Sequence, residues 1–207
     1  MGGFFNLDGP FARFGNMLAD IMILSLLWII FSIPIVTIGA ATTALFYVTT
    51  RRISDKEGYI IRDFWKSFRM NFKQATACWL IILLMIMVLF FNITNIDILG
   101  SARVIVLPIQ LGIAIETCII SLYVFPIVAR FELSLKDVFK NAFFMANRHL
   151  LTTLALMLVG AGAILLSITT IIFSLVAMGA YAFIASYLIM RVFRKYRPEM
   201  DSDEVLE

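Results

Sequence analysis

The stretch that decides the fold is 150–190, LLTTLALMLVGAGAILLSITTIIFSLVAMGAYAFIASYLIM, which contains 41 residues and no charge. As one continuous helix it would be about 62 Å long, at 1.5 Å per residue. The hydrocarbon core of a bilayer is only roughly 30 Å thick, so a single crossing cannot use that length. The stretch therefore predicts a transmembrane hairpin, with spans at about 150–167 and 171–191 and a tight turn between them.

Three more charge-poor stretches precede it, at 21–50, 74–96 and 104–129, and only Glu116 interrupts them. The whole chain is 61% hydrophobic, with a mean hydropathy of +0.95. Soluble proteins are about 45–50% apolar, so a water-soluble fold of this size could not cover so much apolar surface. We predict an all-α, polytopic transmembrane helix bundle whose surroundings are a lipid bilayer.

The basic residues predict which side of the membrane each connection occupies. Most of the 17 Lys and Arg residues lie in 51–73, 130–148 and 191–197. The positive-inside rule makes these segments cytoplasmic, and with them the C-terminus. Because juxtamembrane basic clusters usually meet anionic lipid headgroups, a nucleic-acid partner is not expected. We predict a single membrane domain over 1–198 and an acidic cytoplasmic tail at 199–207.

The number of crossings depends on the stretch 21–50, which is long for one span and short for two. Pro34 stands in its middle, lacks an N–H and disfavours helix in the preceding residue. A break there predicts a hairpin with spans at about 12–33 and 38–52, six crossings in total, and a cytoplasmic N-terminus. The alternative is one tilted, kinked helix, which gives five crossings. The remaining predicted spans are 74–96, 104–129 and the two of the last hairpin.

Two amphipathic segments, at about 60–73 and 134–148, precede the second and third hairpins. In each, apolar residues at helical spacing oppose basic ones, the pattern of a helix at the cytoplasmic membrane interface. Both contain the pattern Asp-x-aromatic-Lys-polar, at 63–67 and 137–141, which suggests a repeated unit of an interfacial helix followed by a hairpin. The residues predicted to face the interface or dock a partner are Phe64, Trp65, Lys66, Phe139 and Lys140.

Glu116 is the acidic residue deepest within a predicted span, thirteenth of the 26 residues of 104–129. A charged carboxylate at this depth costs about 2.5–3.5 kcal/mol on insertion scales, so it must be protonated, paired or beside water. One interpretation is a proton or ion site, or a substrate contact. The other is a structural hydrogen bond to a neighbouring helix.

The break around Pro34 is the second candidate site. Non-helical backbone at membrane depth is tolerated only where protein or water satisfies it, and such breaks line binding sites in some transporters. Thr37 offers a hydroxyl there, and Gly39 permits close approach. The simpler interpretation is a tight external turn with a helix cap.

Enzyme signatures are absent from the sequence, which contains no GxSxG, HExxH, Walker A or GxGxxG motif. One histidine and two cysteines, without metal-ligand spacing, leave little for triad or metal chemistry. We therefore expect no catalytic residue, no cofactor and no metal site.

The segments LLW at 26–28, SIPIVTIGAATTAL at 32–45, DFWKSF at 63–68 and NFKQA at 71–75 resemble the YesL family of bacterial integral membrane proteins. That family has no established biochemical activity, and its members often accompany genes for carbohydrate uptake and degradation in Gram-positive bacteria. The resemblance implies a plasma-membrane protein that is accessory to carbohydrate uptake, or that assembles with a sugar-transporter complex or another membrane protein. The alternative function is a small transporter or channel with Glu116 as its intramembrane site.

Overall fold

The computed structural model describes residues 10–54, 58–169 and 171–200, and within these ranges it contains helices and no strand. The predicted all-α class is therefore confirmed. The tail predicted at 199–207 lies outside the described residues from 201 onward. The elements are α1 (Pro10–Ser32), η1 (Ile35–Thr37), α2 (Ile38–Ile53), α3 (Ile60–Thr94), η2 (Ile96–Ala102), α4 (Arg103–Arg130), α5 (Leu135–Arg148), α6 (Leu150–Thr169) and α7 (Ile171–Met200).

Five of the described helices, α1, α3, α4, α6 and α7, are long and apolar enough to cross a membrane. The bounds of α1, α4 and α6 lie within two residues of the predicted spans, whereas α3 begins well before its predicted span and α7 extends beyond its own. Their length and composition are consistent with a multi-pass membrane protein in a lipid bilayer. The sixth predicted crossing falls on α2, whose 16 residues extend only about 24 Å. The choice between five and six crossings stays a prediction.

The first hairpin forms where Pro34 predicted it. Pro34 is extended, with φ −75° and ψ 118°, and it separates α1 from the short turn η1. Two contacts hold α1 and α2 antiparallel on either side of the break. Trp28 Nε1 donates a hydrogen bond to Thr42 Oγ1 at 3.0 Å, and Arg52 Nη2 lies 3.1 Å from Asp20 Oδ2.

Helix α2 occupies the centre of the core. Ten of its 16 residues are buried, and it packs against α1, α3, α4 and α7. Its sequence explains this position, since small residues let neighbouring transmembrane helices approach closely. The small buried residues of α2 are Gly39, Ala40, Ala41, Thr42, Thr43, Ala44 and Thr49.

Helix α3 differs from the prediction. The segment 60–73, expected as a separate interfacial helix, and the span 74–96 form one continuous helix of 35 residues. No glycine or proline stands between Ile60 and Thr94 to interrupt the backbone hydrogen bonds. In addition, Phe64 and Phe68 on the inner face of its first half are buried in the core, so this half is held against the protein. Among the described residues, the third hairpin alone follows a separate amphipathic helix, α5.

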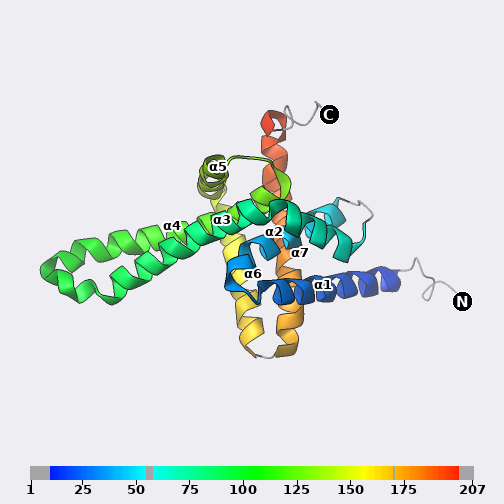
Figure 1. The fold of residues 1–207 in the computed structure, drawn as a ribbon, viewed down its shortest axis with the longest axis horizontal. Coiled ribbons are helices and arrows are strands. Elements are labelled where there is room, and N and C mark those ends of the chain that lie inside the picture. The colour runs from blue at the N-terminus through cyan, green and yellow to red at the C-terminus, as the bar shows by residue number, and fades with distance from the viewer. Residues whose placement is uncertain (1–9, 55–57, 170, 201–207) are drawn as a thin grey trace, which may run out of the picture.

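The hairpins α3–α4 and α6–α7 leave the core in different directions (Figure 1). In that view α3 and α4 extend far to the left, whereas α6 and α7 run vertically and α1 reaches to the right. Helix α5 packs against α4 and α6. The outer part of the α3–α4 hairpin exposes most of its large apolar side chains, as expected for surfaces solvated by lipid. On α3 these are Leu80, Ile81, Leu84, Met85, Ile86, Met87, Val88, Phe90 and Phe91.

Candidate functional site

Glu116 of α4 is half-buried and faces the amphipathic helix α5. The amide of Asn147, in the last turn of α5, donates from Nδ2 to Glu116 Oε1 at 2.7 Å. The same nitrogen donates to the Phe143 carbonyl at 3.0 Å, so both amide hydrogens have acceptors and the side chain is fixed in orientation. Glu116 thus makes the interhelical hydrogen bond that its structural interpretation requires, with an asparagine as donor.

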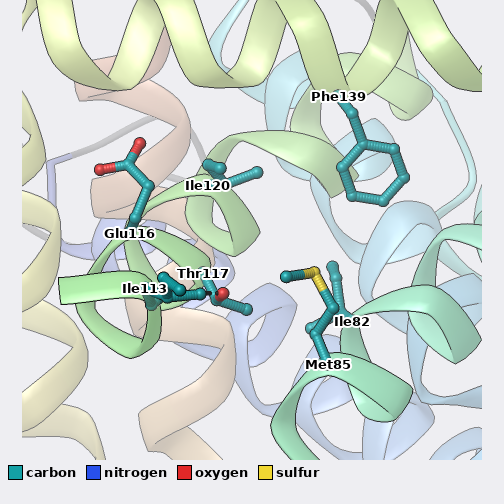
Figure 2. Close-up of a pocket in the computed structure, with 7 residues that line it drawn as sticks. All are labelled: Ile82, Met85, Ile113, Glu116, Thr117, Ile120 and Phe139. Carbon is teal, nitrogen blue, oxygen red and sulfur yellow. Dashed lines mark hydrogen bonds between the residues drawn. The ribbon is translucent and has the colours of Figure 1, made fainter. Parts of the chain in front are cut away.

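A cavity of about 150 Å³ lies beside Glu116, between α3, α4 and α5. Figure 2 shows the side chains of Ile120, Met85 and Phe139 around this cavity, while the Glu116 carboxylate points away from them. The hydroxyl of Thr117 donates to the Ile113 carbonyl at 2.8 Å and is therefore satisfied within its own helix. The cavity wall is apolar, and Glu116 supplies its one ionisable group. The seven lining residues are Ile82, Met85, Ile113, Glu116, Thr117, Ile120 and Phe139.

The break after α1 is satisfied by the protein itself. Thr37 Oγ1 donates to the Phe31 carbonyl at 2.6 Å and to the Pro34 carbonyl at 2.7 Å. Trp79 of α3 donates from Nε1 to the Ile35 carbonyl at 2.7 Å. These bonds supply the partners that non-helical backbone needs at membrane depth. The geometry favours a tight turn, although it does not use Thr37 as a side-chain cap of α2.

Gly39 follows this turn and allows a close approach between α2 and α3. A Cβ added at Gly39 would lie 2.5 Å from the Ala75 carbonyl oxygen and 2.6 Å from Trp79 Cβ. Both distances are far below ordinary van der Waals contact. Glycine at this position therefore allows α2 and α3 to pack closely, as small residues do between membrane helices.

The five predicted docking residues occupy different environments. Phe64 is fully buried and packs against Phe31, with ring centroids 5.5 Å apart, so its side chain is not at the surface. Phe139 is half-buried and lines the cavity beside Glu116. Trp65, Lys66 and Lys140 are exposed. The structure thus leaves three of the five side chains available to the surroundings of the protein.

Trp65 and Lys66 belong to a larger surface, which we name the outer face of α3. It lies in the first half of the helix, opposite the buried side chains of Phe64 and Phe68. Exposed apolar and basic residues alternate there, so the surface combines apolar area with positive charge. The outer face of α3 comprises Ile61, Arg62, Trp65, Lys66, Arg69, Met70, Phe72 and Lys73.

His149 joins α5 to α6 and lies near two positively charged side chains. Burial, Lys195 of α7 and Arg148 all lower the pKa of His149 below its ordinary value of 6.5. The protein therefore favours the neutral imidazole at neutral pH. Within the described ranges no cluster of three or more His, Cys, Asp or Glu side chains could hold a metal ion.

The sequence does not predict two contacts of the candidate sites, from Asn147 to Glu116 and from Trp79 to the Ile35 carbonyl. Asn147 and Glu116 are 31 residues apart in sequence. No sequence spacing predicts a contact between a membrane span and the last turn of a separate amphipathic helix. For Trp79 the sequence gives a weak indication of a contact, because an indole N–H inside an apolar stretch needs a hydrogen-bond acceptor. Nothing in the sequence indicated that this acceptor is a backbone carbonyl of the Pro34 break.

The comparisons with known proteins relate part of the chain to a described family. No curated protein and no solved structure matches it. Residues 21–93 match the family described as "Protein of unknown function, DUF624". The matched segment covers α1 from Ile21, the Pro34 break, the buried α2 and nearly all of α3. The chain is thus similar to this family over the part of the fold that contains its central helix.

Proposed function

We propose that this protein is a non-enzymatic, multi-pass plasma-membrane protein that works by attaching to a partner membrane protein. The observation that carries the proposal is the outer face of α3. Four exposed apolar and four exposed basic side chains alternate on it, while the opposite face is anchored in the core by Phe64 and Phe68. A rigid, partly apolar and positively charged surface fits a partner with apolar and acidic groups close to the membrane.

The resemblance to the YesL family suggests the kind of partner. Because members of that family often accompany genes for carbohydrate uptake and degradation, we propose a sugar-transporter complex as the partner. The basic residues of the outer face would then lie on the cytoplasmic side, as the positive-inside rule predicts. The match to the DUF624 family over 21–93 is compatible with this proposal, since its description assigns no activity.

Co-purification from the native cell, grown on different sugars, tests the attachment. The variant Trp65→Ser with Lys66→Glu changes one apolar and one basic residue of the outer face and should release a protein that co-purifies with the parent chain. A matched control, Ile98→Ser with Arg103→Glu, changes an exposed apolar and an exposed basic residue beyond the far end of α3. If both variants retain the same proteins as the parent, attachment through the outer face of α3 is refuted.

A second candidate is a small transporter or channel, which the presence of an ionisable residue, Glu116, within the membrane helix α4 favours. In that case Glu116→Gln should abolish proton- or ion-coupled flux in proteoliposomes without lowering expression. Flux of the variant equal to that of the parent, or no flux in the parent, would exclude this candidate.

A further inference from the structure

Three basic side chains from different elements lie together where α5 ends and α6 begins. Arg148 is the last residue of α5, His149 joins α5 to α6, and Lys195 belongs to the C-terminal part of α7. Lys195 and Arg148 both act on His149 through their positive charges, and each lowers the pKa of His149. Among the described residues, the charged side chains that act on this imidazole are thus both cations. We name Arg148, His149 and Lys195 the basic cluster.

The packing of the helices explains why these side chains meet. Helices α6 and α7 form a hairpin and pack along each other, so the first turn of α6 lies at the same end as the last turns of α7. Helix α5 packs against α6, and Figure 1 shows it at that same end of the hairpin. The side chains of Arg148 and Lys195 are exposed, and His149 is half-buried. The basic cluster therefore presents positive charge to the surroundings of the protein.

A neighbouring pair of residues indicates that the basic cluster lies at the level of the lipid headgroups. Arg191 Nη2 donates a hydrogen bond to Tyr187 Oη at 2.6 Å, and Arg191 Cζ lies 4.6 Å from the centre of that ring. Tyrosine is enriched at membrane–water interfaces, because its ring is apolar and its hydroxyl is polar. Lys195 follows Arg191 by about one turn on the same face of α7. The basic cluster thus lies where α7 leaves the hydrocarbon core, at the depth of lipid phosphates.

An exposed apolar surface of α6 continues from the basic cluster along the membrane helix. Helix α6 begins one residue after His149, and four leucines near its start are each at least 55% exposed. Within the hydrocarbon core such a surface is covered by acyl chains. A ligand that fits both parts combines an anionic head with long apolar chains. The four exposed leucines of α6 are Leu150, Leu151, Leu154 and Leu158.

We propose that the basic cluster binds the phosphate of one anionic phospholipid, whose acyl chains lie along the four exposed leucines of α6. Guanidinium and ammonium groups form charge-assisted hydrogen bonds with phosphate oxygens, and the bound anion also reduces the repulsion between the cations. A zwitterionic lipid fits less well, because its headgroup brings a positive group next to the basic cluster. The inference goes beyond the proposed function, since this site lies on α5, α6 and α7 and needs no attachment through the outer face of α3.

Binding of tritiated phosphatidylglycerol to the immobilised full chain in a neutral detergent tests the proposal. Unlabelled phosphatidylcholine should compete at least roughly tenfold more weakly than unlabelled phosphatidylglycerol, because it carries no net charge. Glycerol phosphate, which has the anion without the chains, should compete more weakly still. Its arm of the experiment separates a lipid site from a site for free phosphate.

Variants then locate the site. Arg148→Gln with Lys195→Gln should weaken binding of phosphatidylglycerol by at least roughly tenfold, because each Lys or Arg at a membrane surface strengthens the attraction to anionic lipid about fivefold. The matched control, Arg103→Gln with Lys136→Gln, removes one exposed Arg and one exposed Lys outside the basic cluster and should bind like the parent. If the double variant does not fold, Lys195→Gln alone keeps the test decisive, since Lys195 is exposed near the end of α7. It should weaken binding about fivefold.

Four results would each overturn the proposal. Phosphatidylcholine could compete as well as phosphatidylglycerol, which would indicate a general lipid coat. Glycerol phosphate could compete as well as the lipid, which would indicate a site for free phosphate. The cluster variants could bind like the parent in a monodisperse protein, or the matched control could lose as much binding as the double variant. Either of these last two results would place the bound lipid elsewhere on the protein.

Discussion

Replacing Gly39 with alanine tests whether the close approach of α2 and α3 holds the core together. The added methyl group would lie 2.5 Å from the Ala75 carbonyl oxygen, 2.6 Å from Trp79 Cβ and 3.1 Å from Phe125 Cε1. Two of these atoms belong to backbone or to the root of a side chain, which no rotamer change can move. The helices α2 and α3 must therefore separate by about an ångström to restore normal contact.

The structure allows the size of the effect to be worked out. Overpacking a well-filled core costs about 1–3 kcal/mol, and the separation would also stretch the bond from Trp79 to the Ile35 carbonyl. The higher helix propensity of alanine stabilises a helix by about 0.8–1.0 kcal/mol relative to glycine, and this gain partly offsets the cost of overpacking. A chain of this length loses about 2–4 °C of melting temperature per kcal/mol. We expect Gly39→Ala to lower the melting temperature by several degrees in spite of its better helix propensity.

Thermal unfolding of the purified protein in one detergent measures this, with Gly162→Ala as the matched control. Gly162 lies in the membrane helix α6, and a Cβ there meets no heavy atom within 4 Å. The control should melt at the parent temperature or slightly above it, because it gains propensity without a clash. If Gly39→Ala also melts at or above the parent temperature, the tight packing of α2 on α3 described above is incorrect.

Three further predictions concern contacts around this core. Reversing either charge of the pair Asp20–Arg52 should cost about 1–3 kcal/mol, and reversing both should recover most of the melting temperature; no recovery would show that the pair does not join α1 to α2. Trp79→Phe should cost about 0.5–1.5 kcal/mol, because the bond from Nε1 to the Ile35 carbonyl is lost while that carbonyl keeps the Ile38 N–H, and an unchanged melting temperature would contradict that role. The lowered pKa of His149 means that the unfolded chain binds a proton more readily than the folded one. Stability should therefore be highest above about pH 7 and fall as the pH drops towards 5, and His149→Gln should flatten this profile; identical profiles for parent and variant would refute it.

The sequence predicted the membrane helices well and their contacts poorly, for physical reasons that particular residues make clear. Charge-free runs located α4, α6 and α7 to within a few residues at most of their ends, apart from the basic C-terminal part of α7, because hydrophobic length is a local property. Pro34 located the first turn, since its effect on the backbone is also local. The bond between Asn147 and Glu116 depends on how α5 and α4 are rotated about their axes, and a single sequence does not record that rotation.

The same reasoning explains the one architectural error. The amphipathic pattern of 60–73 predicts a helix in the membrane interface, because basic and apolar residues alternate there at helical spacing. That pattern equally describes a helix that buries its apolar face in protein, and Phe64 lies fully buried against Phe31. Periodicity identifies which side chains share a face, whereas the material that covers the face depends on tertiary structure.

The divergence of the two long hairpins has a consequence for how this core is stabilised. Lipid solvates apolar helices about as well as other apolar helices do, so the exposed outer part of α3–α4 carries no penalty comparable to that in water. Cohesion must then come from close packing and from polar contacts at the centre. There, Ser25 Oγ accepts a hydrogen bond from the Gly179 backbone N–H at 2.8 Å, and the hydroxyls of Thr49 and Ser186 lie 2.7 Å apart. Because each bond joins two different helices, and because both meet α7, this small polar network sets the position of α7 relative to α1 and α2.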